Sequence, residues 1–180
     1  MTVTAAGCTM GEQLSLWGSD GAWHVVSRCD PRARALADRH YSRQTVGARE
    51  FMANGRPLVM LTIDGAAVWG AIENLDPVGH LRWRCSLFRN EAPARHLSSD
   101  LVREATRRTR LYWRRRYGSV PPVPLQTEVH PERTRRKRDP GRCFRRAGWV
   151  VVGESRGLVV LQAPPDDVGG SETPQRIELT

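Results

Sequence analysis

The chain has 180 residues, the length of a single domain that can bury a hydrophobic core, and it contains no apolar run of about 18 residues that would span a membrane. Its formal net charge is +9; residues 163–180 carry −3, so residues 1–162 carry +12, nearly all of it as arginine. The four cysteines form no C-x-x-C pair and have no histidine at zinc spacing, so the composition excludes zinc-finger and membrane-spanning classes and predicts a reduced, soluble, cytoplasmic protein.

Strand and helix signals alternate along residues 21–162, which we predict to form a single domain. The expected strands cover residues 23–28, 58–64, 66–74, 81–88, 125–129, 149–153 and 158–162. The expected helices cover residues 31–42, 98–116 and 140–147. This order predicts an α/β fold with a mixed, mostly antiparallel sheet and helices on both faces. We expect residues 1–20 to form a flexible arm and residues 163–180 to form a disordered acidic tail.

Several boundaries carry specific local signals. Asp30 can cap the first helix, and Pro31 occupies its first turn, where a missing N–H removes no hydrogen bond. The pair Asp64-Gly65 predicts a two-residue hairpin turn between the second and third strands. The tryptophans inside strand patterns are predicted to lie in the core.

Residues 82–116 combine a predicted anion site with a basic helix. The strand in this segment leads through the loop RNEAPARHL into a helix that begins at Ser98 and Ser99. The free N–H groups at a helix N-terminus attract anions, so we predict that phosphate groups bind there. The predicted site consists of Arg89, Asn90, Ser98 and Ser99. An alternative for Asn90 is that it caps the loop.

The basic helix has one arginine-rich face opposite an apolar stripe. The arginines of this face are Arg103, Arg107, Arg110 and Arg114. A second basic group lies in the linker PERTRRKRD, and we predict that both groups flank one cleft near Glu128 and bind double-stranded DNA. The predicted DNA-binding residues are Arg43, Arg103, Arg107, Arg110, Arg135, Arg136 and Arg138. The alternative is solvated surface in a protein whose GC-rich genome favours arginine.

Four short motifs together resemble a known family. They are HYSR (His40 to Arg43), CSLFRNE (Cys85 to Glu91), LSSDL-x-x-EA (Leu97 to Ala105) and GRCF-x-x-AGW (Gly141 to Trp149). In this order, over residues 22–162, they resemble the Mom-type DNA-modification proteins of phages and their actinobacterial relatives, within the GNAT acyltransferase superfamily. The resemblance implies a GNAT-like fold, in which residues 89–99 are the counterpart of the pyrophosphate site for coenzyme A.

The resemblance also implies an activity. Members of the Mom-type family are understood to transfer an acyl- or carbamoyl-type group to the N6 amino group of adenine in DNA, which protects phage DNA from restriction. Acetyl-CoA or a related acyl-CoA is the implied cofactor, and an iron ion has been associated with the family. The loop RNEAPARHLSS has a proline and no glycine, unlike most GNAT loops, so the sequence leaves open whether coenzyme A binds.

Two pairs of polar residues are candidates for the chemistry. His40 and Tyr41 follow the first helix, where an imidazole can act as a base or a metal ligand and a phenol can donate a proton or stack on a base. Glu128 and His130 alternate with Val129 on a strand, so they share one face. We predict His40, Tyr41 and Glu128 as catalytic residues, and His40, Glu128 and His130 as the ligands if a metal binds. The alternatives are a histidine at a helix C-terminus, a core tyrosine and a solvated edge strand.

The leading hypothesis is modification of adenine in DNA. An atom inside a duplex is reached by extruding the base, so this hypothesis predicts an aromatic-lined pocket with Tyr41, Phe88 and Phe144 as candidates for the lining. Two other functions remain open: an ordinary GNAT N-acetyltransferase acting on a small amine or a protein, and a DNA-binding protein without catalysis. Either a monomer or a dimer fits the sequence.

Overall fold

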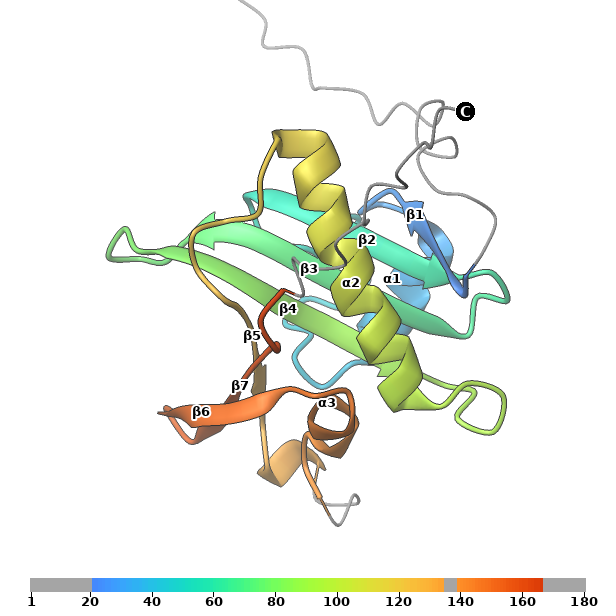
Figure 1. The fold of residues 1–180 in the computed structure, drawn as a ribbon. Helices are drawn as coiled ribbons and strands as arrows, with labels where there is room; N and C mark the ends of the chain where they lie inside the picture. The colour runs from blue at the N-terminus through green and yellow to red at the C-terminus, as the bar shows by residue number, and fades with distance from the viewer. Residues whose placement is uncertain (1–20, 135–138, 167–180) are drawn as a thin grey trace, which may run out of the picture.

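The computed structural model describes residues 21–134 and 139–166 as an α/β fold built on one sheet. In chain order its elements are β1 (Trp23–Val26), α1 (Pro31–Asp38), β2 (Arg56–Thr62), β3 (Ala67–Leu75), β4 (Leu81–Asn90), α2 (Ser98–Tyr117), β5 (Leu125–Val129), the 3-10 helix η1 (Glu132–Thr134), α3 (Arg142–Arg146), β6 (Val150–Ser155) and β7 (Leu158–Gln162). Helix α2 crosses one face of the sheet and α1 lies on the other (Figure 1). The fold is therefore the GNAT-like mixed, mostly antiparallel sheet that the sequence predicts. Within the described ranges, no helix combines the length and the apolar character needed to cross a membrane.

The seven strands lie in the order β1-β2-β3-β4-β5-β7-β6, and every neighbouring pair is antiparallel except β4 and β5. This parallel pair is short, because only residues 83–85 of β4 face residues 125–127 of β5. Strand β4 continues to Asn90 and β5 to Val129 without further pairing to each other. The two strands thus diverge, and we call this place the β4–β5 fork.

A β-bulge in β4 lies at the start of the fork. Gly70 of β3 pairs with Leu87, whereas the next residue, Ala71, pairs with Cys85. Ser86 therefore has no partner in this ladder. One extra residue changes the face to which the following side chain points. Cys85 packs in the hydrophobic cluster beneath α2, and Leu87 packs in the cluster beneath α1.

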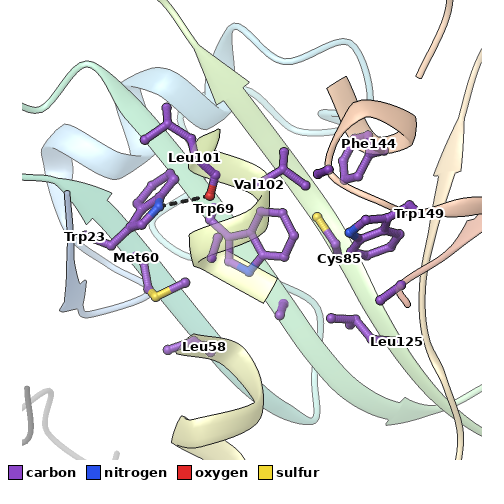
Figure 2. Packing of buried hydrophobic residues seen from close by; sticks show 14 of the residues in the cluster. Trp23, Leu58, Met60, Trp69, Cys85, Leu101, Val102, Leu125, Phe144 and Trp149 are labelled. Atoms are coloured by element: carbon purple, nitrogen blue, oxygen red, sulfur yellow. Dashed lines mark hydrogen bonds between the residues drawn. The ribbon is translucent and has the colours of Figure 1, made fainter. Parts of the chain in front are cut away.

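The larger of the two clusters joins the sheet to α2 and α3 and is rich in aromatic side chains (Figure 2). Its buried aromatic members are Trp23, Trp69, Trp83, Trp113, Phe144 and Trp149. Each tryptophan that the structure describes is at most 3% exposed, so the prediction of core tryptophans is confirmed for these residues. The Trp23 indole N–H points towards α2 and donates to Leu101 O at 3.1 Å (Figure 2).

Two further indole N–H groups fix α2 on the sheet through threonine hydroxyls. Trp69 Nε1 donates to Thr109 Oγ1 at 3.0 Å, and Trp149 Nε1 donates to Thr106 Oγ1 at 3.2 Å. Each hydroxyl in turn donates to the carbonyl oxygen four residues earlier in the helix, at 2.7 Å in both cases. The polar atoms of these two indole–threonine contacts are therefore paired, as burial of polar groups requires.

The first helix is shorter than predicted. Asp30 caps it as expected, but the helix ends at Asp38. The Asp38 carboxylate accepts hydrogen bonds from Arg43 Nε at 2.7 Å and from Gly47 N at 3.1 Å, and these bonds fold the following chain back against the end of the helix. Residues 39–42, which the sequence places in the helix, therefore lie in a turn after it.

The hairpin of β2 and β3 is confirmed, but its connection is longer than the predicted two residues. Residues 63–66 join the strands. Asp64 accounts for the difference, because its Oδ1 accepts from Thr62 Oγ1 at 2.7 Å and from Ala66 N at 3.1 Å, which closes a wider turn. The predictions for residues 1–20 and 167–180 lie outside the described residues.

The Trp69–Thr109 bond can be tested by substitution. We expect Thr109→Val to lower the free energy of unfolding by about 1–3 kcal/mol, because it leaves the buried indole N–H without an acceptor. Urea unfolding measures this difference. Arg107→Ala, at an exposed position of the same helix, is the matched control and should stay within about 0.5 kcal/mol of the wild type. Equal effects of the two substitutions would show that this hydrogen bond does not fix α2.

Candidate functional site

A pocket of about 650 Å³ opens on the α1 face of the sheet. Its wall is the segment that links α1 to β2, residues 41–53, and its floor is formed by the sheet. The floor residues are Ile72, Arg84, Cys85, Ser86, Leu87, Glu128 and Leu158. Because they come from the diverging ends of β4 and β5 and their neighbours, the pocket lies beside the β4–β5 fork. Its volume is within the range of small-molecule sites, roughly 300–1,000 Å³.

Tyr41 fastens the link segment to the end of β5. Its hydroxyl donates to Glu128 O at 3.5 Å and accepts from His130 N at 3.4 Å. Arg133 Nη1 donates to the Tyr41 carbonyl oxygen at 2.8 Å. Burial raises the pKa of the Tyr41 phenol above its ordinary value, so the phenol keeps its proton at neutral pH. These contacts hold an uncharged aromatic ring at the wall of the pocket.

Glu128 and His130 both line the pocket, in agreement with their alternation on the strand. Val129 between them packs into the cluster beneath α2. Glu128 Oε1 lies 3.8 Å from Arg82 Nη2, and His130 Nδ1 accepts from Arg133 N at 3.4 Å. A carboxylate and an imidazole thus face the same space, where either can accept a proton from a bound molecule.

His40 lies next to the pocket and is not part of its lining. Its Nδ1 is 2.7 Å from Ser42 Oγ, and its ring packs against the Tyr41 ring with 4.3 Å between centroids. Among the described residues, no group of three His, Cys, Asp or Glu side chains lies close enough to hold a metal ion. Glu128 and His130 share the pocket lining and His40 does not, so a metal on these three residues stays a prediction.

Part of the predicted anion site at the start of α2 takes part in contacts within the protein. Asn90 Nδ2 donates to His96 O at 2.8 Å and to Ser98 Oγ at 3.0 Å, so Asn90 caps the loop. Ser99 is buried, and the first turn of α2 carries Asp100, whose negative charge already faces the positive end of the helix dipole. Coenzyme A binding at this helix N-terminus, which has no side-chain cap, stays a prediction.

Arg89 belongs to an ion-pair network that joins the exit of β4 to the end of α1. The Glu91 carboxylate accepts from Arg39 Nε and Nη2, both at 2.7 Å, and from Arg89 Nε at 2.7 Å. Arg89 Nη1 also donates to Arg39 O at 2.6 Å. The Arg39 guanidinium, with Arg89 beside it, lowers the pKa of Glu91 to about 2. Arg89 therefore holds the loop instead of presenting its charge to a cofactor.

The predicted DNA-binding face of α2 contacts other parts of the protein. Arg103 Nη2 donates to Arg146 O at 3.0 Å, and Arg110 Nη2 donates to Pro164 O. Arg107 is exposed. The apolar stripe of α2 is buried on the sheet face opposite the pocket. The prediction that the arginines of α2 flank a cleft near Glu128 is therefore wrong for this pocket.

Arg43 lines the pocket, but its guanidinium is used within the wall. Its Nε donates to Asp38 Oδ1 at 2.7 Å and its Nη2 to Ala48 O at 3.0 Å, and its side chain is only 10% exposed. Arg43 thus stabilises the link segment. Residues 135–138, which include three of the predicted DNA-binding arginines, lie outside the described residues, so that part stays a prediction.

Two residues of the pocket floor, Arg84 and Ser86, are not predicted from the sequence. Arg84 lies between the core residues Trp83 and Cys85 on one strand, and side chains of a strand alternate between the two faces of the sheet. This alternation could have predicted that Arg84 lies on the face opposite Trp83 and Cys85. No local signal predicts Ser86, because a bulge depends on the register of the neighbouring strand.

Comparisons of the chain with models of protein families, with curated proteins and with solved structures found no match. The case for a function therefore rests on the fold and on the geometry of the pocket. The features that carry it are the β4–β5 fork and the polar groups that line the pocket beside it.

The Glu91 network predicts a pH dependence of stability. The folded-state pKa lies near 2, below the ordinary value of 4.5, so the carboxylate stabilises the fold fully above about pH 4.5 and loses this contribution as the pH falls towards 2. We expect Glu91→Gln to destabilise the fold by about 1 kcal/mol at pH 7, since the pair is partly exposed, and by less at pH 3. Thermal unfolding at both pH values measures the difference, with the exposed Glu154→Gln as control. A pH-independent difference would mean that Glu91 acts without its charge.

Proposed function

We propose that this chain is a GNAT-like transferase that modifies adenine in double-stranded DNA at the N6 amino group, with the base extruded from the duplex into the pocket beside the β4–β5 fork. The transferred group is of the acyl or carbamoyl type. The observation that carries the proposal is the shared position of Tyr41, Glu128 and His130 in one pocket, on a sheet of GNAT-like strand order.

The lining of the pocket suits a flat heterocycle. Tyr41 and Phe51 contribute aromatic rings, and apolar side chains such as Ile72 lie in the floor. A base outside the duplex gains stacking and apolar contact from such groups. The other two aromatic candidates, Phe88 and Phe144, pack in the core instead, with their ring centroids 5.9 Å apart.

The adenine amino group needs a base, because its lone pair is delocalised into the ring and it becomes a good nucleophile only as it loses a proton. As N6 forms its bond to the carbonyl carbon of an activated donor such as an acyl-CoA, the bond from that carbon to the donor's leaving group breaks, and the leaving group departs with the electron pair. We assign the accompanying proton transfer from N6 to the Glu128 carboxylate, which faces the pocket from the end of β5. Tyr41 positions the heterocycle through its ring, and His130 offers a second polar contact on the same side.

The rim of the pocket is basic on the side where the linker begins. Arg133 lines the pocket and is the first arginine of the run at residues 133–138. Phosphate groups that flank an extruded base lie outside the pocket that receives it, so this run is in a suitable part of the sequence to bind them. The charge therefore supports a polyanionic substrate over a small amine.

An ordinary GNAT N-acetyltransferase is the second candidate. It is favoured by the same strand order and would use the same polar groups. This candidate predicts acetyl transfer from acetyl-CoA to a small amine or a protein in the absence of DNA, and a calorimetric titration without acetyl-CoA binding would eliminate it.

The proposal predicts a modified deoxyadenosine in DNA from cells that express the chain. Digestion to nucleosides and mass spectrometry should detect it with the wild type and at least about 100-fold less of it with Glu128→Gln, because a positioned proton acceptor contributes roughly 10²–10⁴-fold. Arg156→Gln, at an exposed position between β6 and β7 that does not line the pocket, is the matched control and should retain wild-type levels. Normal nucleosides alone, with a folded wild-type chain, would contradict the proposal.

The linker predicts a salt dependence of DNA binding. Each arginine that neutralises a phosphate of duplex DNA adds roughly 0.9 to the slope of log affinity against log salt concentration, so replacing Arg135, Arg136 and Arg138 together with Ala should flatten the slope by about two to three units. Fluorescence anisotropy with a short duplex at several salt concentrations gives the slope. An unchanged slope would show that the run is solvated surface.

A further inference from the structure

Arg84 places a positive charge in the floor of the pocket without a partner among the described residues. It lies in the middle of β4, between the buried Trp83 and Cys85, and pairs through its backbone with Gln126 of β5. Its Nε is sealed from water and has no hydrogen-bond acceptor. Within residues 21–134 and 139–166, no carboxylate lies within 4.0 Å of its guanidinium nitrogens.

The other two arginines of the pocket differ in this respect. Arg43 is paired with Asp38, and Arg133 donates to the Tyr41 carbonyl oxygen. A guanidinium that loses water without gaining an acceptor is unfavourable, so such groups in proteins are normally paired. An anionic group that reaches the pocket floor can supply the acceptor that Arg84 lacks and can balance its charge.

We infer that Arg84 binds the oxyanion of a small organic molecule, a carboxylate or a phosphate monoester, which enters the pocket as a second substrate beside the base. Both groups accept two parallel N–H bonds from one guanidinium. The pocket of about 650 Å³ is well above the lower limit for small-molecule sites, roughly 300 Å³, so it has room for a heterocycle and a small molecule together.

The rest of this ligand is small and carries no further negative charge. Phe51, Met52 and Leu158 offer apolar contact, whereas the carboxylates of Glu50 and Glu128 line the same pocket and repel a polyanion. This separates the ligand from the phosphates of DNA. The inference rests on the proposed function because it takes this pocket as the reaction site. Anion binding is measured without DNA, so the experiment can contradict anion binding by Arg84 without contradicting DNA modification, and the reverse.

The test measures how anions affect thermal unfolding of the full chain. Inorganic phosphate and sodium butyrate are the probes, and sodium chloride at equal ionic strength is the reference. A ligand that binds only the folded state raises Tm. We expect at least one probe to raise the Tm of the wild type by roughly 3–5 °C over chloride, and neither to do so in Arg84→Met. An effect of phosphate alone identifies a phosphate monoester site, and an effect of butyrate alone identifies a carboxylate site.

The same variant distinguishes a binding arginine from a structural one. Removing an unpaired charge from the middle of the sheet should leave the Tm without anion unchanged or higher, whereas loss of a structural arginine lowers it. Arg156→Met, exposed between β6 and β7 and outside the pocket, is the matched control and should keep the wild-type response.

A second measurement does not depend on the folding of Arg84→Met. The NMR signal of the Arg84 Nε–H group, assigned by its absence in Arg84→Lys, should shift saturably with the effective anion. The inference is overturned if neither anion acts on the wild type, or if Arg84→Met responds like the wild type. It is also overturned if Arg84→Met has a lower Tm and the Nε–H signal of the wild type does not shift.

Discussion

Strands β4 and β5 pair over only three residues, and this short parallel contact determines what surrounds it on both faces of the sheet. At its last position Thr127 Oγ1 donates to Cys85 O at 2.9 Å; beyond it, the backbone groups and side chains of the diverging strands need other partners. On the α2 face the space is filled by Phe88, Phe144 and Trp149, with ring centroids 5.9 Å apart for the first pair and 5.1 Å for the second. On the α1 face the space remains open as the pocket.

The aromatic filling closes the α2 face. Trp149 hydrogen-bonds to Thr106 on α2, and Arg103 on α2 hydrogen-bonds to the carbonyl oxygen of Arg146 at the end of α3. Helices α2 and α3 are thus in direct contact, and Asn90 ties the start of α2 to β4. On the α1 face, the link segment supplies a wall of the pocket and the alternating residues of β5 supply polar groups.

Periodicity predicts the parts of this arrangement that depend on neighbouring residues in the chain. The alternation at residues 125–129 predicts β5 and the common face of Glu128 and His130, and the apolar stripe of residues 98–116 predicts α2. The end of α1 is less predictable, because it depends on hydrogen bonds that the Arg43 side chain and the Gly47 backbone N–H donate to the Asp38 carboxylate across a turn.

The pocket itself could not be predicted from local patterns. Its wall is an irregular segment whose position depends on the Tyr41 hydroxyl reaching the end of β5, 87 residues further along the chain. Asn90 shows the same limit in another form. Its sequence context allows a binding role and favours a loop cap, and the positions of His96 and Ser98 decide for the cap.

Net charge is a weak guide to function in this chain, because many of its arginines have internal partners. Arg39 pairs with Glu91, Arg43 with Asp38 and the buried Arg108 with Glu104. Such pairs contribute to the fold and leave little positive field for a ligand. A composition cannot separate a paired arginine from an unpaired one, since both add one unit to the total. What points to a ligand is therefore the position of a charged group relative to hydrogen-bond acceptors. Arg84 lines a pocket and its Nε has no acceptor, whereas the other two arginines of the pocket, Arg43 and Arg133, have partners within the protein.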